Sequence, residues 1–215
     1  MLARFFKGYI PAKQLRSDIL KKIKVFSDFA CPFCYIGFSI ADRMVKENLD
    51  IEFYWYPYEL DRDASYEGSS ILGSIPMDQI DMAYKRIERL GSEYGLVYSN
   101  KTIKFNTGLL HRAALYAQEV GSFYPFASEA FKAIFTEGKN VASKEVINQI
   151  GIEVGLNIHE MIETIEAGDF EDMMVQAREM AVAYEIESVP TFIREDGKKV
   201  TLLNGYNKFK KDLID

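Results

Sequence analysis

The chain has 215 residues, of which 48% are hydrophobic and 27% charged, and its formal net charge is −6. Such a composition is typical of an ordinary globular protein with enough apolar residues for a full core, and it excludes a disordered or fibrous chain. The negative charge and the lack of long basic runs argue against a nucleic-acid partner. No apolar run reaches the roughly 18 residues of a membrane-spanning helix, so we expect no membrane contact.

The first 22 residues lack the continuous apolar stretch of a secretory signal. We therefore expect residues 1–22 to form an N-terminal extension and the protein to be cytoplasmic. Several basic residues precede the first acid, Asp18, which leaves an organelle transit peptide as the alternative. The single serine and the internal Pro11 argue against that alternative.

The N-terminal part of the chain predicts a strand, a helix and a second strand. Residues 23–27 are β-branched, apolar or small, and residues 51–56 are bulky and alternating, so both segments favour strands. Between them, apolar residues recur at helical spacing from Cys31 onward, with Pro32 in the first turn, where a missing N–H is harmless. Asn48 ends this helix. The order of elements predicts a parallel βαβ unit with a right-handed crossover.

The middle of the chain favours helices, and its last thirty residues favour a hairpin followed by a helix. Residues 59–73 are rich in Asp, Ser and Gly and predict a loop. Asp196-Gly197 is a strong hairpin signal between predicted strands 189–193 and 200–203, and a last helix is expected over 208–214. We expect helices over 76–94, 108–120, 122–136, 143–154, 159–167 and 170–184, with Thr107, Ser122 and Ser143 as N-caps.

Together these elements predict an α/β fold. The order is β-α-β, then a helical block, then β-β-α, and removal of the block leaves the βαβ–ββα order of a thioredoxin-like core. We therefore assign residues 23–65 and 185–215 to that core and residues 66–184 to an inserted all-helical domain.

The chain contains only two cysteines, Cys31 and Cys34, spaced as Cys-x-x-Cys at a strand-to-helix junction. Within a βαβ unit this spacing indicates a redox pair, whereas a closed zinc site needs about four ligands, and His111 and His159 lie far apart in the sequence. Helix N-terminal N–H groups near Cys31 favour its thiolate, the reactive species. Cys34, about one turn later, can attack a mixed disulfide and release the substrate. We therefore predict catalytic cysteines and no metal.

Pro190 opens the predicted strand that precedes the final hairpin. Thioredoxin-like redox proteins place a cis-proline at this position, facing the cysteine pair, although cis X–Pro bonds are uncommon. We expect a cis Val189–Pro190 bond, with the backbone of Val189 free to pair with an extended substrate segment. An ordinary trans proline at the start of an edge strand is the alternative.

A family resemblance covers roughly residues 23–213. The run Val25-Phe26-Ser27-Asp28-Phe29-Ala30-Cys31-Pro32-Phe33-Cys34-Tyr35-Ile36-Gly37 closely resembles the DsbA-like oxidoreductases, in particular their FrnE-like branch. Further similar segments are Tyr56-Pro57-Tyr58-Glu59-Leu60, Asn106-Thr107, His111-Arg112-Ala113, Glu137-Gly138 and Val189-Pro190.

The resemblance implies that Cys31 is the nucleophile and Cys34 the resolving thiol. It also implies a cis bond before Pro190. Strongly oxidising members carry His where this chain has Phe33, and Phe cannot supply a positive charge to a thiolate, so we expect a less oxidising pair. The residues that we expect to bind substrate are Pro32, Phe33, Val189, Pro190, Asn106 and His111, the last two placed by the resemblance near the interface between the helical block and the core.

These features predict a thiol–disulfide oxidoreductase that acts on disulfide-containing or unfolded proteins, or on small thiols. The cysteine pair is the redox centre, so no cofactor is expected, and glutathione is left open as a substrate. One alternative is a glutathione-dependent transferase or isomerase of the same fold, although those enzymes typically present a serine where this chain has Cys31. Another alternative is a non-catalytic, chaperone-like protein.

Overall fold

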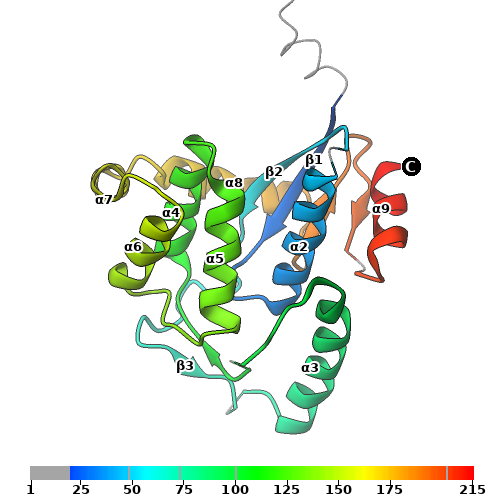
Figure 1. Cartoon of the computed structure of the whole chain (residues 1–215), viewed down its shortest axis with the longest axis horizontal. Coiled ribbons are helices and arrows are strands. Elements are labelled where there is room, and N and C mark those ends of the chain that lie inside the picture. The colour runs from blue at the N-terminus through cyan, green and yellow to red at the C-terminus, as the bar shows by residue number, and fades with distance from the viewer. Residues whose placement is uncertain (1–19, 48, 73, 100, 202) are drawn as a thin grey trace, which may run out of the picture.

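The computed structural model describes residues 20–47, 49–72, 74–99, 101–201 and 203–215, so nearly all of the predicted extension 1–22 lies outside the described residues. Figure 1 shows a sheet with helices on both faces and a larger group of helices beside it. In chain order the elements are β1 (Lys21–Ser27), α2 (Pro32–Lys46), β2 (Ile51–Pro57), β3 (Ser69–Ser70), α3 (Met77–Gly91), the 3-10 turn η1 (Ser92–Tyr94), β4 (Ile103–Lys104), α4 (Gly108–Glu119), α5 (Phe123–Phe135), α6 (Lys144–Glu153), α7 (Ile158–Ala167), α8 (Glu171–Ala183), β5 (Thr191–Ile193), β6 (Lys199–Val200) and α9 (Tyr206–Ile214).

The sheet of the core has the strand order β2-β1-β5-β6. β1 and β2 are parallel, with Val25 opposite Trp55, whereas β5 runs antiparallel to β1 and β6 antiparallel to β5. The predicted βαβ–ββα order is therefore confirmed, and with it the thioredoxin-like fold class. β5 and β6 are shorter than predicted, and α9 begins at Tyr206 rather than at residue 208.

Alternate residues of β1 point to opposite faces of the sheet, as the two-residue period of a strand requires. Val25 belongs to the main core, whereas Phe26 packs with Ala181 of α8 and with Ile193 in a second, smaller cluster. α8 therefore covers the face of the sheet opposite α2. The sequence-based division at residue 184 places α8 in the insertion, and that division stays a prediction; Ala181 of α8 packs on the sheet, whereas Met174 of α8 packs in the main core.

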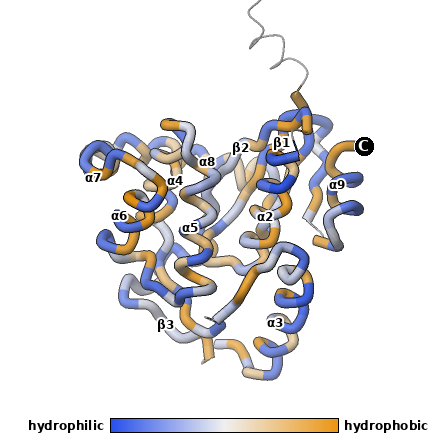
Figure 2. Tube along the Cα trace, viewed as in Figure 1, coloured by the Kyte–Doolittle hydropathy of each residue, from blue (hydrophilic) through white to orange (hydrophobic). Residues whose placement is uncertain are grey.

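The helical insertion shares one hydrophobic core with helix α2 and the sheet. Phe131 of α5 stacks on Tyr35 of α2, with ring centroids 5.2 Å apart and an interplanar angle of 9°. Phe38 of α2 also contacts Phe131, at 5.6 Å between centroids. In Figure 2 α3 is drawn largely in blue, in keeping with the exposed, hydrophilic outer side of this helix. Among the described residues, no helix is long and apolar enough to cross a membrane.

A short antiparallel ladder of β3 and β4 was not predicted. Ser70 pairs with Ile103, which ties part of the predicted loop 59–73 to the segment before α4. Each strand has only two residues, too few for a two-residue alternation to be recognised in a sequence.

The predicted N-caps had different outcomes. Ser143 caps α6, and its hydroxyl accepts a hydrogen bond from the backbone N–H of Val146. Thr107 and Ser122 occupy the N-cap positions of α4 and α5, as predicted, but neither side chain makes a capping hydrogen bond. The hydroxyl of Thr107 instead donates to the carboxylate of Asp28, a stronger acceptor than any neutral group nearby.

Candidate active site

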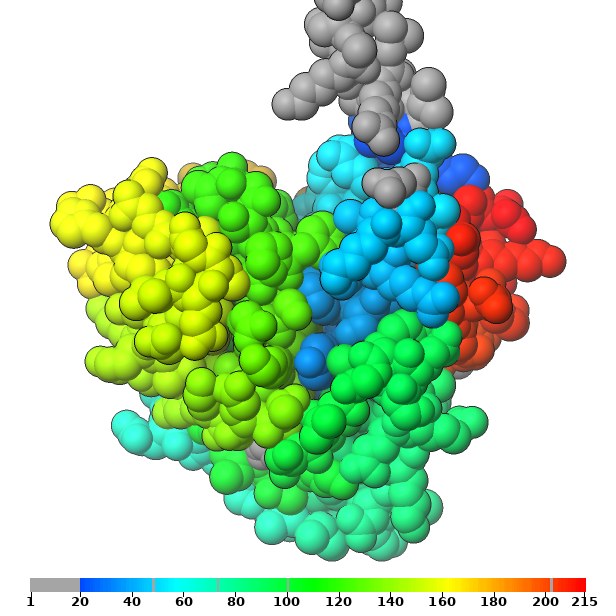
Figure 3. Space-filling view, in the orientation of Figure 1, coloured from blue at the N-terminus to red at the C-terminus, as the bar shows by residue number. Residues whose placement is uncertain are grey.

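The two cysteines lie at the start of α2, directly after the turn that follows β1. Cys31 is the N-cap residue, with extended backbone angles (φ −98°, ψ 116°), and Pro32 is the first helical residue, as predicted. Both thiols are buried, with 7% of Cys31 and none of Cys34 exposed. In Figure 3 the blue atoms of the β1–α2 segment are visible in a furrow between the green atoms of α3 and α5, so the turn reaches the surface. Cys31 is the thiol that a substrate can approach.

Cys31 faces the segment that leads into β5. Its Sγ lies 3.5 Å from the carbonyl oxygen of Val189, to which the thiol donates a hydrogen bond. The Val189–Pro190 bond is cis, as expected, and Pro190 is buried. The structure thus brings Cys31, Val189 and Pro190 together from segments about 158 residues apart in the sequence.

The two thiols have opposite tendencies to ionise. The pKa of Cys31 is lowered, chiefly because the Cys34 thiol donates a hydrogen bond to it; burial opposes this effect, and the backbone N–H groups of Cys34 and Phe33 support it. The pKa of Cys34 is raised by burial and by the neighbouring Cys31, although the Ser27 hydroxyl partly offsets this. At neutral pH the outer sulfur is therefore the better nucleophile and the inner one keeps its proton.

Asp28, which follows β1, is the centre of a buried hydrogen-bond network that the sequence analysis did not identify. Only 1% of this residue is exposed. One carboxylate oxygen accepts from the Thr107 hydroxyl at 2.8 Å, from His111 Nε2 at 3.1 Å and from the backbone N–H of Ala30 at 3.1 Å. The other accepts from the backbone N–H of Leu60 at 2.8 Å. The carboxylate therefore links the turn after β1 together with the first turn of α2 (residues 28–34, the redox turn), the loop after β2 and helix α4.

These hydrogen bonds keep the buried carboxyl ionised. Burial alone would raise the pKa of Asp28, but the hydrogen bond and charge of His111, with the N–H groups of Leu60 and Ala30, lower it below its ordinary value. The backbone N–H of Asp28 itself points at Cys34 Sγ, at 3.5 Å. A single residue thus contacts the inner thiol with its backbone and the helical insertion with its side chain.

Asn106 and His111 lie at the interface between the helical block and the core, where the resemblance places them. The amide nitrogen of Asn106 donates to the carbonyl oxygens of Arg62 and Ala64 at 3.0 and 3.2 Å, and its oxygen accepts from the backbone N–H of Gly108 at 3.0 Å. Both side chains are buried and bonded within the protein. These contacts give the two residues structural positions, and their contact with substrate stays a prediction.

Pro32 and Phe33 form the first turn of α2 beside the cysteines. The carbonyl oxygen of Pro32 accepts a hydrogen bond from the Tyr98 hydroxyl at 3.3 Å. Phe33 is half-buried, and the guanidinium carbon of Arg86 on α3 lies 5.5 Å from the centre of its ring. Phe33 itself supplies no positive charge, but the fold brings one to it from α3.

Gly37 allows the closest approach between α2 and the segment before β5. A Cβ built on Gly37 would lie 2.9 Å from Cγ and 3.2 Å from Cβ of Pro190. Gly37 is therefore a positioning residue for Pro190. The sequence contained this glycine within the resemblance but offered no reason for it, because its contact is 153 positions away.

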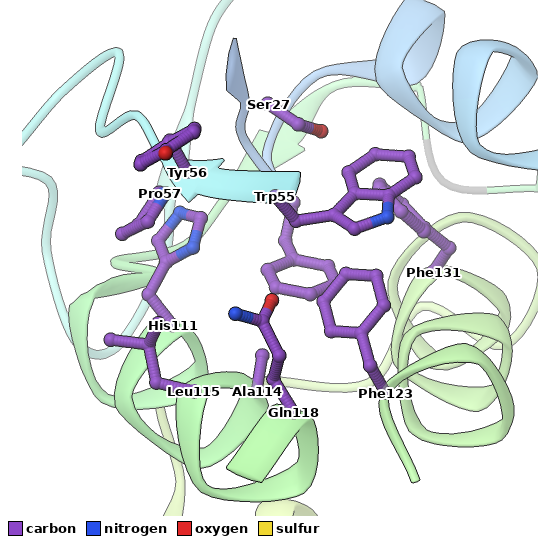
Figure 4. Close-up of a pocket in the computed structure, with 11 residues that line it drawn as sticks. Ser27, Trp55, Tyr56, Pro57, His111, Ala114, Leu115, Gln118, Phe123 and Phe131 are labelled. Carbon is purple, nitrogen blue, oxygen red and sulfur yellow. The ribbon is translucent and has the colours of Figure 1, made fainter. Parts of the chain in front are cut away.

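A cavity of about 30 Å³ lies behind the redox turn, between the strands and helix α4. Figure 4 shows the His111 ring of α4 beside Pro57 and Tyr56, and the Gln118 amide directed from α4 into the space below Trp55. The space is large enough for one water molecule and has polar groups on its wall. Within the described ranges, no three His, Cys, Asp or Glu side chains gather as a metal site requires.

Comparisons with known proteins agree with this geometry. The sequence profile of the DSBA-like thioredoxin domain matches residues 22–212. The chain is 28% identical, over 178 residues, to the uncharacterized protein YwbO of Bacillus subtilis (strain 168), a match that covers 81% of this chain and 86% of YwbO.

Two solved structures share the fold. The probable DsbA oxidoreductase SCO1869 of Streptomyces coelicolor superposes with a TM-score of 0.80 at 18% identity, over 90% of this chain and 88% of its own. The cytosolic disulfide reductase DsbM of Pseudomonas aeruginosa, solved with GSH, superposes with a TM-score of 0.69 at 16% identity, over 89% of this chain and 96% of its own.

The hydrogen bond from Cys34 to Cys31 can be tested with two variants of the inner cysteine. Cys34→Ser keeps a hydroxyl donor, whereas Cys34→Ala removes it. We expect a higher pKa for Cys31 in Cys34→Ala than in Cys34→Ser, because the largest effect that lowers this pKa is lost. The measurement is the rate of Cys31 alkylation against pH. Identical titration midpoints in the two variants would show that the inner side chain does not act as the donor.

Replacement of Asp28 should weaken the fold in a pH-dependent way. Because its pKa is lowered on folding, the ionised carboxyl stabilises the protein above its ordinary pKa, and this contribution is lost as the pH falls further. We expect Asp28→Asn to lower the free energy of unfolding by about 1–3 kcal/mol at pH 7. The difference in free energy of unfolding between wild type and Asp28→Asn should become smaller below about pH 4.

Urea unfolding of wild type and of Asp28→Asn between pH 7 and pH 3 measures this difference in free energy of unfolding. Asp196→Asn is the control, because that carboxyl is exposed on the hairpin turn and its loss should change stability by less than about 0.5 kcal/mol. A difference in free energy of unfolding that stays constant from pH 7 to pH 3 contradicts the prediction.

Gly37→Ala should displace Pro190 from α2. Alanine favours a helix over glycine by about 1 kcal/mol, so a simple propensity effect would stabilise the protein. We expect a net loss of stability instead, because overpacking costs about 1–3 kcal/mol, together with a changed rate of Cys31 alkylation. Ser39→Ala on the same helix is the control. A Gly37→Ala protein of raised stability and unchanged alkylation would exclude the tight contact.

Proposed function

The chain belongs to the DSBA-like thioredoxin domain family, and from this premise we propose that it is a thiol–disulfide oxidoreductase in which Cys31 and Cys34 exchange electrons with the disulfides or dithiols of proteins or of small thiols. The observation that carries the proposal is the asymmetry of the pair. Cys31 has a lowered pKa at a helix N-terminus, whereas the fully buried Cys34 has a raised one.

In the proposed reaction the Cys31 thiolate attacks one sulfur of a substrate disulfide. The substrate S–S bond breaks, a mixed disulfide forms on Cys31, and the other substrate sulfur leaves as a thiolate that takes up a proton. Cys34 then loses its proton and attacks Sγ of Cys31, which releases the second substrate thiol. The two cysteines are oxidised to a disulfide and the substrate disulfide is reduced to two thiols.

The same steps in reverse oxidise a substrate dithiol, so the reduction potential decides the direction. Phe33 stands where strongly oxidising relatives carry His, and we propose a potential more negative than the roughly −120 mV of DsbA. DsbM, which shares the fold, is described as a disulfide reductase and was solved with GSH. That observation supports small thiols as substrates beside proteins.

We propose that substrates bind across the Cys31–Val189 contact. Cys31 Sγ and the carbonyl oxygen of Val189 are 3.5 Å apart, so a chain attached to Cys31 lies alongside the backbone that leads into β5. Backbone groups there are suited to pair with an extended segment, as in β-strand addition. The reaction requires no metal or organic cofactor, because the sulfur atoms carry the electrons.

The two cysteines should have separable roles in an assay of disulfide reduction by this protein. Cys31→Ser should abolish turnover, because no nucleophile remains, whereas Cys34→Ser should accumulate a mixed disulfide with substrate that is resolved slowly. The readouts are thiol release and the mass of the trapped adduct.

Other outcomes would support one of the two alternative functions. Full suppression of client aggregation by Cys31→Ser, without turnover by wild type, would instead support the chaperone-like alternative. Conjugation or isomerisation that depends on glutathione, without net thiol release, would support the transferase or isomerase alternative.

A further inference from the structure

Helix α3 brings a permanent positive charge to the redox turn. The guanidinium carbon of Arg86 lies 5.5 Å from the centre of the Phe33 ring, within the range of a cation–π contact. Figure 1 shows α3 below the N-terminal end of α2. Phe33 is half-buried and Arg86 is exposed, so the guanidinium lies over the ring at the surface of the protein.

No carboxylate neutralises Arg86 within the helix. The positions three and four residues away hold Met82, Ala83, Arg89 and Leu90, none of them acidic. Over the described part of the chain, no carboxylate oxygen lies within 4 Å of the Arg86 guanidinium, whereas most other described arginines have such a partner.

The other two cations of α3, Lys85 and Arg89, also have no carboxylate oxygen within 4 Å among the described residues, but they differ from Arg86 in the sequence spacing of nearby acids. Lys85 has Asp81 four residues before it and Glu88 three residues after it, and Arg89 has Glu93 four residues after it. Arg86 is thus the cation of this helix without an acid at helical spacing. It is also the one that contacts the redox turn through Phe33.

The charge of Arg86 is not needed to ionise Cys31. The groups that lower the pKa of Cys31 are the Cys34 thiol first, and then the backbone N–H groups of Cys34 and Phe33. All of them belong to the turn itself. The guanidinium is therefore available to a group that arrives with the substrate.

Helix α3 lies beside Cys31 as well as beside Phe33. Burial and the nearby charge of Cys31 raise the pKa of Tyr84, which lies on α3 two residues before Arg86. A group a few bonds from a sulfur atom on Cys31 therefore lies near the helix that carries Arg86. The protein has a net charge of −6, which repels anionic substrates in general, so a local cation matters for them.

We propose that Arg86 binds a carboxylate carried by the disulfide substrate and makes the protein prefer substrates whose reacting sulfur lies a few bonds from a carboxylate. The planar guanidinium suits this group, because it can donate two parallel hydrogen bonds to a carboxylate. The inference rests on the proposed thiol–disulfide exchange and names its substrate class. The carboxylate belongs either to a small disulfide or to an acidic side chain beside a cysteine in a protein.

The test compares three small disulfides of different charge: dithiodipropionate, which is negative, hydroxyethyl disulfide, which is neutral, and cystamine, which is positive. We expect Arg86→Gln to lower kcat/KM for dithiodipropionate by about threefold to tenfold, as for an exposed to partly desolvated ion pair. The neutral probe should change much less, and added salt should reduce the wild-type preference for the negative probe. Lys85→Gln, which removes the same charge from the preceding residue, should keep that preference.

The outcomes separate the two proposals. An equal loss on all three probes means that Arg86 only supports Phe33, and this result overturns the inference while the exchange reaction stands. An unchanged preference among these probes overturns the inference when the peptide probes described next also show no dependence on Arg86. Wild-type protein inactive on every probe overturns the proposed function and the inference with it.

A second pair of probes identifies the source of the carboxylate. These are a mixed disulfide of a peptide with glutamate beside its cysteine, and the same peptide with glutamine. Arg86 dependence confined to the glutamate peptide supports a protein substrate, whereas dependence confined to dithiodipropionate supports a small one. The absence of Arg86 dependence in both series overturns the inference.

Discussion

The buried carboxylate of Asp28 is the interaction on which the arrangement of the site depends. Its two oxygens accept four hydrogen bonds, from the redox turn, the loop after β2 and helix α4. A buried ionised group is costly unless it is fully paired, so these partners cannot separate without a large loss of stability. The position of the helical insertion and the conformation of the turn before Cys31 are therefore coupled through one side chain.

The same turn explains why two identical side chains behave differently. Cys31 is at the N-cap of α2 and contacts Val189, whereas Cys34 lies one turn deeper with no exposed surface. Burial raises the pKa of Cys34, and a hydrogen bond from its thiol lowers that of Cys31. Each effect strengthens the other, so the proposed division into nucleophile and resolving thiol follows from where the helix begins.

Two further contacts place partners beside the pair from distant parts of the chain. Gly37 lets Pro190 approach α2, because any larger side chain would collide with the proline ring. The guanidinium of Arg86, on α3, lies over the ring of Phe33. Arg86 belongs to the helical insertion and Pro190 follows the insertion in the chain, so the surface around Cys31 is completed by elements that meet only when the insertion packs on the core.

Local patterns were enough for the thioredoxin-like order of elements, the start of α2 at Cys31 and Pro32, and the proximity of the two cysteines, because periodicity, the proline position and Cys-x-x-Cys spacing are all short-range features. The network of Asp28 with Thr107 and His111 was not predictable, since hydrogen bonds across about 80 residues leave no mark at any fixed spacing. For the same reason the sequence placed Thr107 at the N-cap of α4 but did not show that its hydroxyl donates to Asp28, and β3 and β4 were not recognised as strands. The packing of α8 on the sheet and of Arg86 on Phe33 likewise depended on which faces the folded elements turn toward one another, and a pattern along one segment does not contain that information.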